Sequence, residues 1–263
     1  MPRRSAPWRV GALPDDVRTT VERARRALGD RRATPNLVWL SALSGAHRRQ
    51  VTSVLGELER LLPVEEEIRH RHLAAGRESY AQLRAPFELY CLVRLLRPAH
   101  VVETGVSSGV SSAHILAALR RNHEGRLHSI DLPTRQRGPT LGAGESVTAL
   151  PPGKSSGWAV PERLRPRWDL RIGPSQEILP SLVREVGSIG LFLHDGLHTP
   201  TQLAFELATV RPALAPSAVV LADNTAWTGD AFPRFARELG VPIVRRGRGD
   251  LLGVRLPARP PEL

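Results

Sequence analysis

The stretch HVVETGVSSGVSSAHILAALRRN, residues 100–122, decides the fold because it joins a short apolar run to a helical pattern through a glycine-containing turn. Turns of this kind bind several classes of ligand in α/β proteins. A phosphate-binding P-loop requires GxxxxGK[ST], and no lysine is near this turn. A dinucleotide fingerprint requires GxGxxG, but Ser107 and Val110 stand where glycines are needed. The turn therefore predicts a different ligand.

The residues that remain read E-x-G-x-x-x-G-x-S, with Glu103, Gly105, Gly109 and Ser111 at the fixed positions. A carboxylate before the glycines suits an amino group or a sulfonium cation, and Ser111 near the helix N-terminus suits a carboxylate. Asp131, 22 residues after Gly109, ends the next apolar run and is placed to accept both hydroxyls of a ribose. An amino acid joined to a ribose indicates S-adenosylmethionine. The alternative is an ordinary strand–helix turn with an incidental acid.

Short apolar runs alternate with helical patterns from residue 100 onward, which is typical of a parallel sheet with crossover helices. We predict an α/β fold with a Rossmann-like, doubly wound, mostly parallel seven-stranded sheet. The last two runs are joined by a short Gly/Arg turn and predict an antiparallel C-terminal hairpin. The strand-like runs are residues 100–106, 126–132, 168–174, 189–195, 217–223, 241–246 and 249–256.

The N-terminal third has a helical pattern instead. Residues 1–13 resemble a loose tail, and apolar residues at three- and four-residue spacing follow in residues 36–62 and 79–96. Pro63 follows the first pattern, and Pro86 interrupts the second. We predict a tail and helical cap over residues 1–97 and an S-adenosylmethionine-binding domain over residues 98–263. The cap could also serve as the surface of a homo-oligomer.

The segment from 133 to about 167 is rich in Pro, Gly and Ser and is too long for an ordinary strand–helix connection. It leaves the carboxyl edge of the second predicted strand, where open α/β sheets bind ligands. A lid over the site and a disordered insertion are both consistent with this composition.

Composition excludes several classes of protein. The only cysteine among 263 residues is Cys91, which rules out an intramolecular disulfide and a thiolate metal cluster. No apolar run approaches 18 residues and the N-terminus lacks a signal-like apolar segment, so we expect a cytoplasmic protein that does not cross a membrane. The net charge of +11 comes from scattered arginines, with Lys154 the single lysine, a pattern that argues against a nucleic-acid partner.

Five stretches in order over residues 100 to about 230 resemble the class I S-adenosylmethionine-dependent methyltransferases: VVETGVSSGVSS, LHSIDLP, RIGPSQEILP, LFLHDGLHT and VVLADNTAWTG. More narrowly, they resemble the group of catechol O-methyltransferase and related bacterial small-molecule O-methyltransferases. The resemblance implies that the cofactor is bound by Glu103 (methionine amino group), Gly105, Ser107 and Gly109 (turn), Ser111 (methionine carboxylate), Asp131 (ribose), Ser175 and Gln176 (adenine), and Asp195.

Metal-dependent members of this group hold a divalent ion with two aspartates and an asparagine, which match Asp195, Asp223 and Asn224. Three oxygen ligands from adjacent strand ends suit a hard ion such as Mg²⁺. Such an ion lowers the pKa of an acceptor hydroxyl. The alternative is that Asp195 caps a loop and Asn224 stabilises a turn.

The chain departs from the group at the general base. Relatives place a lysine three residues after the first aspartate, where this chain has His198. Histidine is a base near neutral pH without a large pKa shift, so His198 and Asp195 are the catalytic candidates. A structural role for His198 stays open, as it does for His194. Pro174 is a second departure, since it removes a backbone donor near the expected adenine.

The expected activity is transfer of a methyl group to a hydroxyl of a small molecule, assisted by a divalent metal. One alternative is a metal-independent or non-catalytic protein of the same fold that acts through its helical cap. A nucleic-acid methyltransferase is a third possibility, but amino-methylating members of that class carry (Asp/Asn)-Pro-Pro-aromatic where this chain has HDGLHTP.

Overall fold

The structure is a computed structural model that describes Asp15, Thr19 and residues 36–76, 86–132, 150–246 and 251–258. The predicted tail, the first part of the predicted insertion (133–149) and the turn of the predicted hairpin (247–250) lie outside these residues.

A seven-stranded sheet forms the centre of the molecule, in the order β3-β2-β1-β4-β5-β7-β6. Strands β1 to β5 are parallel, and β7 runs antiparallel to both β5 and β6. The predicted parallel sheet with antiparallel C-terminal strands is therefore confirmed. The strands are β1 (His100–Thr104), β2 (Arg126–Asp131), β3 (Trp168–Ile172), β4 (Ile189–His194), β5 (Leu214–Ala222), β6 (Val244–Arg245) and β7 (Leu252–Arg255).

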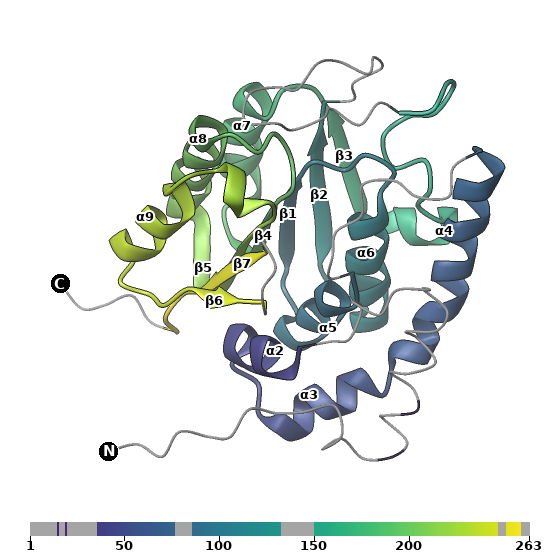
Figure 1. Cartoon of the computed structure of the whole chain (residues 1–263), viewed down its shortest axis with the longest axis horizontal. Coiled ribbons are helices and arrows are strands. Elements are labelled where there is room, and N and C mark those ends of the chain that lie inside the picture. The colour runs from purple at the N-terminus through teal and green to yellow at the C-terminus, as the bar shows by residue number, and fades with distance from the viewer. Residues whose placement is uncertain are drawn as a thin grey trace.

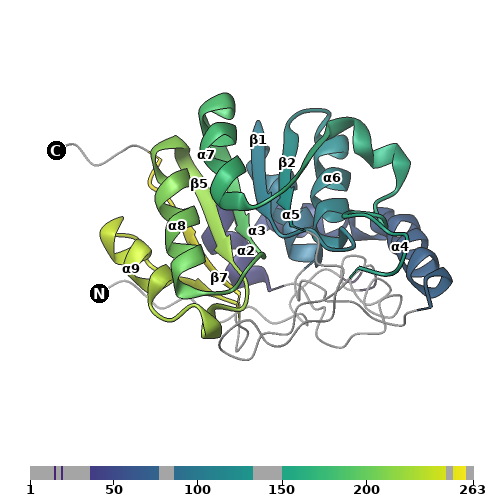
Figure 2. The same ribbon diagram turned by 90° about the horizontal axis from the view of Figure 1, so that it is seen from above.

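Helices cover both faces of the sheet (Figures 1 and 2). One face carries α2 (Leu37–Ser44), α3 (Arg48–Leu55), α4 (Leu62–Ala74), α5 (Pro86–Leu96) and α6 (Val110–Asn122). The other carries α7 (Ser175–Val186), α8 (Pro200–Val210) and α9 (Ala231–Glu238). Short 3₁₀ helices complete the order: η2 (Leu58–Leu61), η3 (Glu162–Arg167), η4 (Arg211–Ala213) and η5 (Thr225–Trp227).

Alternate residues of the central strands enter the two hydrophobic clusters. On β1, Val101 belongs to the cluster under α5 and α6, whereas Val102 belongs to the cluster under α7 and α8. Strand β4 alternates in the same way, with Leu191 and Leu193 on one side and Phe192 on the other. Burial on both faces explains why these strands read as continuous apolar runs in the sequence.

The helical cap packs into the same core as the sheet. Residues 36–62 do not form one helix, because the chain turns at Gly45, with a φ of +67°, and again at Gly56. Pro63 lies in the first turn of α4, where a missing N–H group costs nothing, so it begins a helix. The cap and the sheet share one hydrophobic cluster, and a 2.6 Å ion pair joins Glu88 on α5 to Arg246 beside β6.

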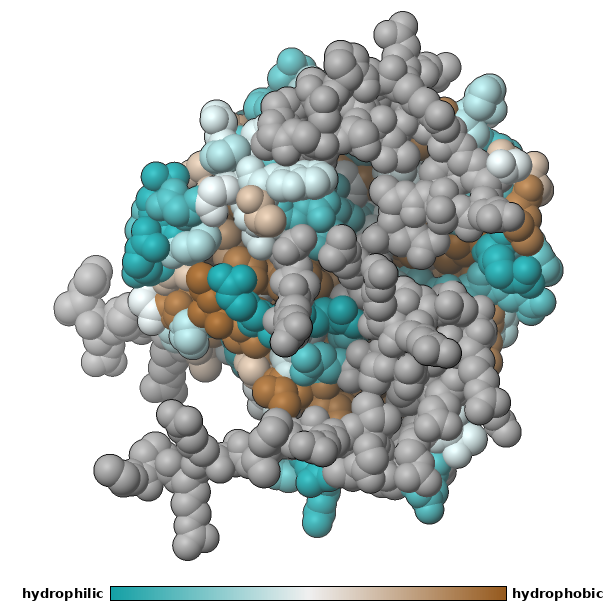
Figure 3. All heavy atoms as spheres, viewed as in Figure 1, coloured by the Kyte–Doolittle hydropathy of each residue, from teal (hydrophilic) through white to brown (hydrophobic). Residues whose placement is uncertain are grey.

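None of the helices in the described part of the chain is both long and apolar enough to span a bilayer. Hydrophilic and hydrophobic residues are interspersed on the face seen in Figure 3.

Candidate cofactor and catalytic site at the strand ends

The turn between β1 and α6 is held tightly between its two neighbours. Gly105 has a φ of +85° and donates its N–H to the carbonyl of Ile130 at 2.9 Å. On the other side, the N–H of Asp195 donates to the carbonyl of Thr104 at 2.8 Å. The order of the strands reverses at β1, and ligands of open α/β sheets bind at such a switch point. The turn is therefore located where a ligand site is expected.

Two hydroxyl groups in the turn lack a hydrogen-bond partner among the described residues. They are the side-chain oxygens of Ser107 and Ser108, and both are buried. Ser107 also has a φ of +50°, an uncommon conformation for a residue with a side chain. Buried hydroxyls normally find partners, and backbone strain clusters at binding sites. Both features fit a polar ligand bound at this turn.

Glu103 lies beneath the turn and is fully buried. Its carboxylate accepts hydrogen bonds from Ser111, Ser112 and Ser129 at 2.5–2.7 Å. Burial raises the pKa of Glu103 to about 7, although these hydroxyls act to lower it. The structure thus brings Glu103 and Ser111 together, and both oxygens of Glu103 already have protein donors.

The raised pKa of Glu103 predicts that its ionisation destabilises the folded state. The folded protein keeps a proton on Glu103 between pH 4.5 and about 7 that the unfolded chain has lost. The penalty is therefore absent below pH 4.5, grows as the pH rises, and is complete above pH 7. Replacement by neutral glutamine removes it. Between pH 5 and pH 8, the unfolding free energy of Glu103→Gln should therefore rise by roughly 2 kcal/mol relative to that of the wild type.

Urea denaturation of both proteins at the two pH values measures this change. The exposed Glu177→Gln on α7 controls for replacing a carboxylate by an amide. A gap between Glu103→Gln and the wild type that does not vary with pH would show that Glu103 does not titrate in this range.

Asp131 ends β2 and is 8% exposed. Its Oδ1 accepts the N–H of Val106 at 3.0 Å, and its Oδ2 accepts the hydroxyl of Ser156. Just beyond, Leu132 and Ile172 are exposed at the ends of β2 and β3. Asp131 therefore contacts the glycine turn directly, as a residue that binds the same ligand as the turn should.

Ser156 belongs to the second half of the predicted insertion. We call residues 150–161 the strap. The N–H groups of Gly157 and Ala159 donate to the carbonyls of Ser107 and Ser108 at 2.8 and 3.0 Å, so the strap lies across the glycine turn. The described part of the insertion is thus a packed segment beside the site.

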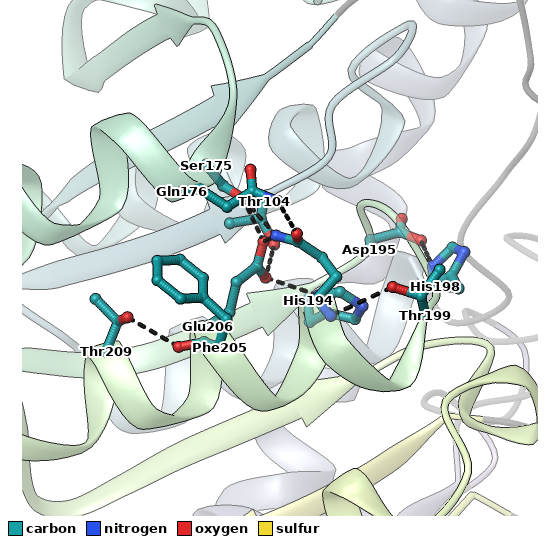
Figure 4. Close-up of polar contacts among 11 residues, drawn as sticks. Thr104, Ser175, Gln176, His194, Asp195, His198, Thr199, Phe205, Glu206 and Thr209 are labelled. Carbon is teal, nitrogen blue, oxygen red and sulfur yellow. Dashed lines mark hydrogen bonds and ion pairs between the residues drawn. The ribbon is translucent and has the colours of Figure 1, made fainter. Parts of the chain in front are cut away.

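Ser175 and Gln176 begin α7, and their side chains meet α8 (Figure 4). Ser175 donates to Glu206 at 2.7 Å, and Gln176 donates to the side-chain oxygen of Gln202. Gln202 also donates to Glu206, at 2.6 Å. The two residues implied to approach adenine therefore hold the α7–α8 contact.

Glu206 is the centre of this polar network and is 1% exposed. It accepts from Thr104 and contacts His194 Nδ1, each at 2.7 Å. Burial acts to raise the pKa of Glu206, but His194 and the hydroxyl donors outweigh it and hold the pKa below its ordinary value. His194 is fully buried against this carboxylate, which favours its reading as a core histidine.

The candidate catalytic and metal residues lie on the loops after β4 and β5, whose last residues pair in the sheet. His198 is 5% exposed. Its Nε2 is 3.6 Å from Asp195 Oδ1, and its Nδ1 is 3.4 Å from Asn224 Nδ2. The N–H of Asp223 donates to the carbonyl at the end of β4 at 2.9 Å. The structure therefore brings His198 together with Asp195 and Asn224.

Sequence reasoning missed several members of the site. Gln202 and Glu206 stand four residues apart beside the apolar positions of α8, and a polar pair on a buried helix face was a readable signal. Ser156 gave no such signal, because its partner depends on the path of an irregular segment. The roles of Ser112 and Ser129 could not be predicted from the sequence either, since their common partner Glu103 lies on a different element, β1.

A family model described as a methyltransferase domain matches residues 102–225. A search of curated protein sequences gives no match.

Solved structures with the same fold include an O-methyltransferase from Bacillus cereus in complex with SAH (S-adenosylhomocysteine), with 14% identity and a TM-score of 0.52 over 73% of this chain and 90% of that one. The O-methyltransferase TomG from Streptomyces achromogenes, in complex with SAM, has 20% identity and a TM-score of 0.51 over 74% of this chain and 89% of that one. The O-methyltransferase NovP has 15% identity and a TM-score of 0.52 over 89% of this chain and 99% of that one.

The domain match covers the glycine turn, Asp131 at the end of β2, and the loops after β4 and β5. These are the elements that form the site. The likeness to solved structures concerns the fold as a whole. Taken together, these findings identify residues 102–225 as a methyltransferase domain, within a chain that has the class I methyltransferase fold.

Proposed function

We propose that this methyltransferase transfers the methyl group to a hydroxyl of a small molecule. The observation that carries the proposal is the direct contact between the cofactor turn and the loop of the candidate base. A Cβ atom added at Gly105 would lie 2.0 Å from the backbone oxygen of Asp195, so these two backbones touch. Asp195 in turn pairs with His198. Donor turn and candidate base are thus neighbours, as methyl transfer requires.

On the donor side, we assign the ribose hydroxyls to Asp131 and polar contacts to the unpartnered hydroxyls of Ser107 and Ser108. Glu103 and Ser111 are the candidates for the charged methionine end, and their mutual hydrogen bond would then open to admit it. When bound, the cofactor supplies a methyl group on a sulfonium, which is transferred by in-line displacement. The protein contributes mostly positioning and electrostatics.

On the acceptor side, we assign the general base to His198. The nearby Asp195 carboxylate favours one ring orientation and stabilises a proton taken up by the imidazole. Asn224 contacts the other ring nitrogen through its side-chain amide. The transfer requires Nε2 as the proton acceptor, so the neutral ring carries its hydrogen on Nδ1, toward the Asn224 side-chain amide. The proton that leaves the acceptor hydroxyl is then held at Nε2 beside Asp195, without a lysine at this position.

A divalent cation such as Mg²⁺ fits the donor chemistry at the same place. Among the described residues, no group of three or more His, Cys, Asp or Glu side chains is arranged to hold a metal ion. The candidate set therefore depends on the amide oxygen of Asn224 beside Asp195 and Asp223. Two carboxylates and an amide suit a hard cation. When bound there, the ion would lower the pKa of the acceptor hydroxyl.

The surroundings of His198 favour a small acceptor with an apolar part. Leu197 and Trp227 are 39% and 37% exposed, and the ring centroid of Trp227 is 6.2 Å from that of His198. A nucleic-acid acceptor finds less support, because several arginines pair with carboxylates of this chain. These pairs include Arg71–Glu67, Arg94–Glu57, Arg171–Glu185 and Arg211–Glu238.

Methyl transfer from labelled S-adenosylmethionine to phenols and sugar alcohols tests the proposal. Label on an acceptor oxygen supports it. Label on nitrogen, or on RNA in preference to every small hydroxyl, contradicts it. Assays with EDTA and then with added Mg²⁺ separate metal-dependent from metal-independent transfer.

Cofactor binding provides a specific prediction for Asp131. Asp131→Ala should weaken binding of S-adenosylhomocysteine at least about tenfold, because it removes a charged acceptor for the ribose hydroxyls. Isothermal titration measures the affinity. Asp169→Ala on β3, whose carboxylate pairs with His128 and Arg171, is the control and should leave the affinity near that of the wild type. Unchanged affinity in folded Asp131→Ala would remove the ribose role.

A further inference from the structure

The strap is built into the protein core beside the cofactor turn. Ala159 and Val160 are fully buried and belong to the hydrophobic cluster shared by the cap and the sheet. Arg71 on α4 donates to the carbonyls of Trp158 and Val160, each at 3.2 Å. Such packing and hydrogen bonding favour a fixed wall over a segment that opens and closes.

The wall also fits closely against the glycine turn. A Cβ atom at Gly109 would lie 2.5 Å from Val160 Cγ2 and 2.9 Å from Gly157 Cα. Gly157 itself lies against the ring of Trp168, since a Cβ there would be 2.1 Å from that ring. Gly109 in the turn and Gly157 in the strap allow this close approach. The approach brings the Ser156 hydroxyl into hydrogen-bond contact with Asp131.

The hydrogen bonds of Asp131 leave room for a ribose. A carboxylate accepts about four hydrogen bonds, two on each oxygen. The N–H of Val106 uses one site on Oδ1, and Ser156 uses one on Oδ2. Counting the described residues, one site remains on each oxygen, which is the number needed by two neighbouring hydroxyl groups.

We infer that Ser156 is a positioning residue for the ribose of the cofactor, supplied by the strap. Its hydroxyl fixes the orientation of the Asp131 carboxylate so that both oxygens face the ribose, and it is 3% exposed, shielded from competing water. This inference rests on the proposed role of Asp131. It adds a member of the cofactor site from a segment that is irregular in structure.

Binding of S-adenosylhomocysteine and its 2′-deoxy and 3′-deoxy analogues to wild type and Ser156→Ala tests this role. Ser156→Ala should weaken binding of S-adenosylhomocysteine about fivefold to tenfold, the effect of one hydrogen bond to a charged group. The loss should be smaller with each deoxy analogue, because one of the two hydrogen bonds that Ser156 supports is already missing. Ser155→Ala, at the exposed neighbouring position, is the control and should bind all three ligands like the wild type.

Two results would overturn the inference. An equal loss for all three ligands would show a structural role only, and tighter binding by Ser156→Ala would show that the hydroxyl competes with the ribose. Thermal unfolding confirms that each variant is folded. If the wild type fails to bind S-adenosylhomocysteine, the proposed function fails; if it binds and only the Ser156 comparison fails, the inference alone is wrong.

Discussion

Replacing Gly105 by alanine should destabilise the folded protein by about 3–5 kcal/mol, a large share of the stability of an ordinary domain. Two costs add. The φ of +85° disfavours any residue with a Cβ, and that Cβ would lie 2.0 Å from the backbone oxygen of Asp195. Backbone cannot rotate away as a side chain would, so β1 and β4 would have to separate at the site itself.

Gly187→Ala separates these two costs. Gly187 ends α7 with a φ of +66°, and a Cβ there would meet nothing within 4 Å. This control therefore has only the conformational cost, about 1 kcal/mol. Urea denaturation of both variants measures the difference between them. Equal destabilisation would mean that the contact between Gly105 and Asp195 is looser than the structure shows.

The strands could be predicted from the sequence because each is short, apolar and bounded by turn residues. All seven predicted runs overlap a strand, including the weak pair near the C-terminus, β6 and β7, although β5 begins three residues before its predicted run. The helical cap was harder to predict from the sequence. Its apolar periodicity continues through Gly45 and Gly56, and only the structure shows that the chain turns at both. Pro63 is ambiguous by nature, since proline both follows helices and begins them.

Within the site, positions fixed by strand ends were predictable and contacts made by irregular segments were not. Asp131, Asp195 and Asp223 stand at the ends of their strands, so the parallel sheet alone brings them to one edge. Their partners depend on tertiary structure. No local pattern indicates that Ser156 reaches Asp131, or that the hydroxyls around Glu103 come from both α6 and β2.

Ser175 and Gln176 show a further limit. Their place at the start of α7 follows from the sequence pattern, but their side chains engage Glu206 and Gln202 on α8. Gln202 and Glu206 on α8 are buried polar groups that require partners, and α7 supplies them here. A role of Ser175 and Gln176 in binding adenine stays a prediction. In that role, the same two side chains would bind adenine and also hold the α7–α8 contact.

Asp223→Ala should lower turnover at least about a hundredfold while leaving the affinity for S-adenosylhomocysteine within a few-fold of the wild type. Asp223 lies on the loop after β5, whereas the residues assigned to the donor lie at the ends of β1 and β2, in the turn after β1 and on α6. Its proposed task is to hold the cation that activates the acceptor hydroxyl, an effect worth several kcal/mol in the transition state. Loss of that charge should therefore affect the chemical step and spare cofactor binding.

Turnover and isothermal titration on the same preparations measure the two quantities separately. Because Asp223 is 5% exposed, its removal could weaken the fold, so thermal unfolding is measured as well and Asp223→Asn is tested beside it. Asparagine keeps the shape and one oxygen ligand but removes the charge, so it should retain part of the activity and respond to higher Mg²⁺. Asp230→Ala, with its carboxylate 67% exposed, is the control for losing a nearby aspartate. Full turnover by a folded Asp223→Ala protein, insensitive to EDTA, would exclude the cation and leave His198 and Asp195 to activate the acceptor.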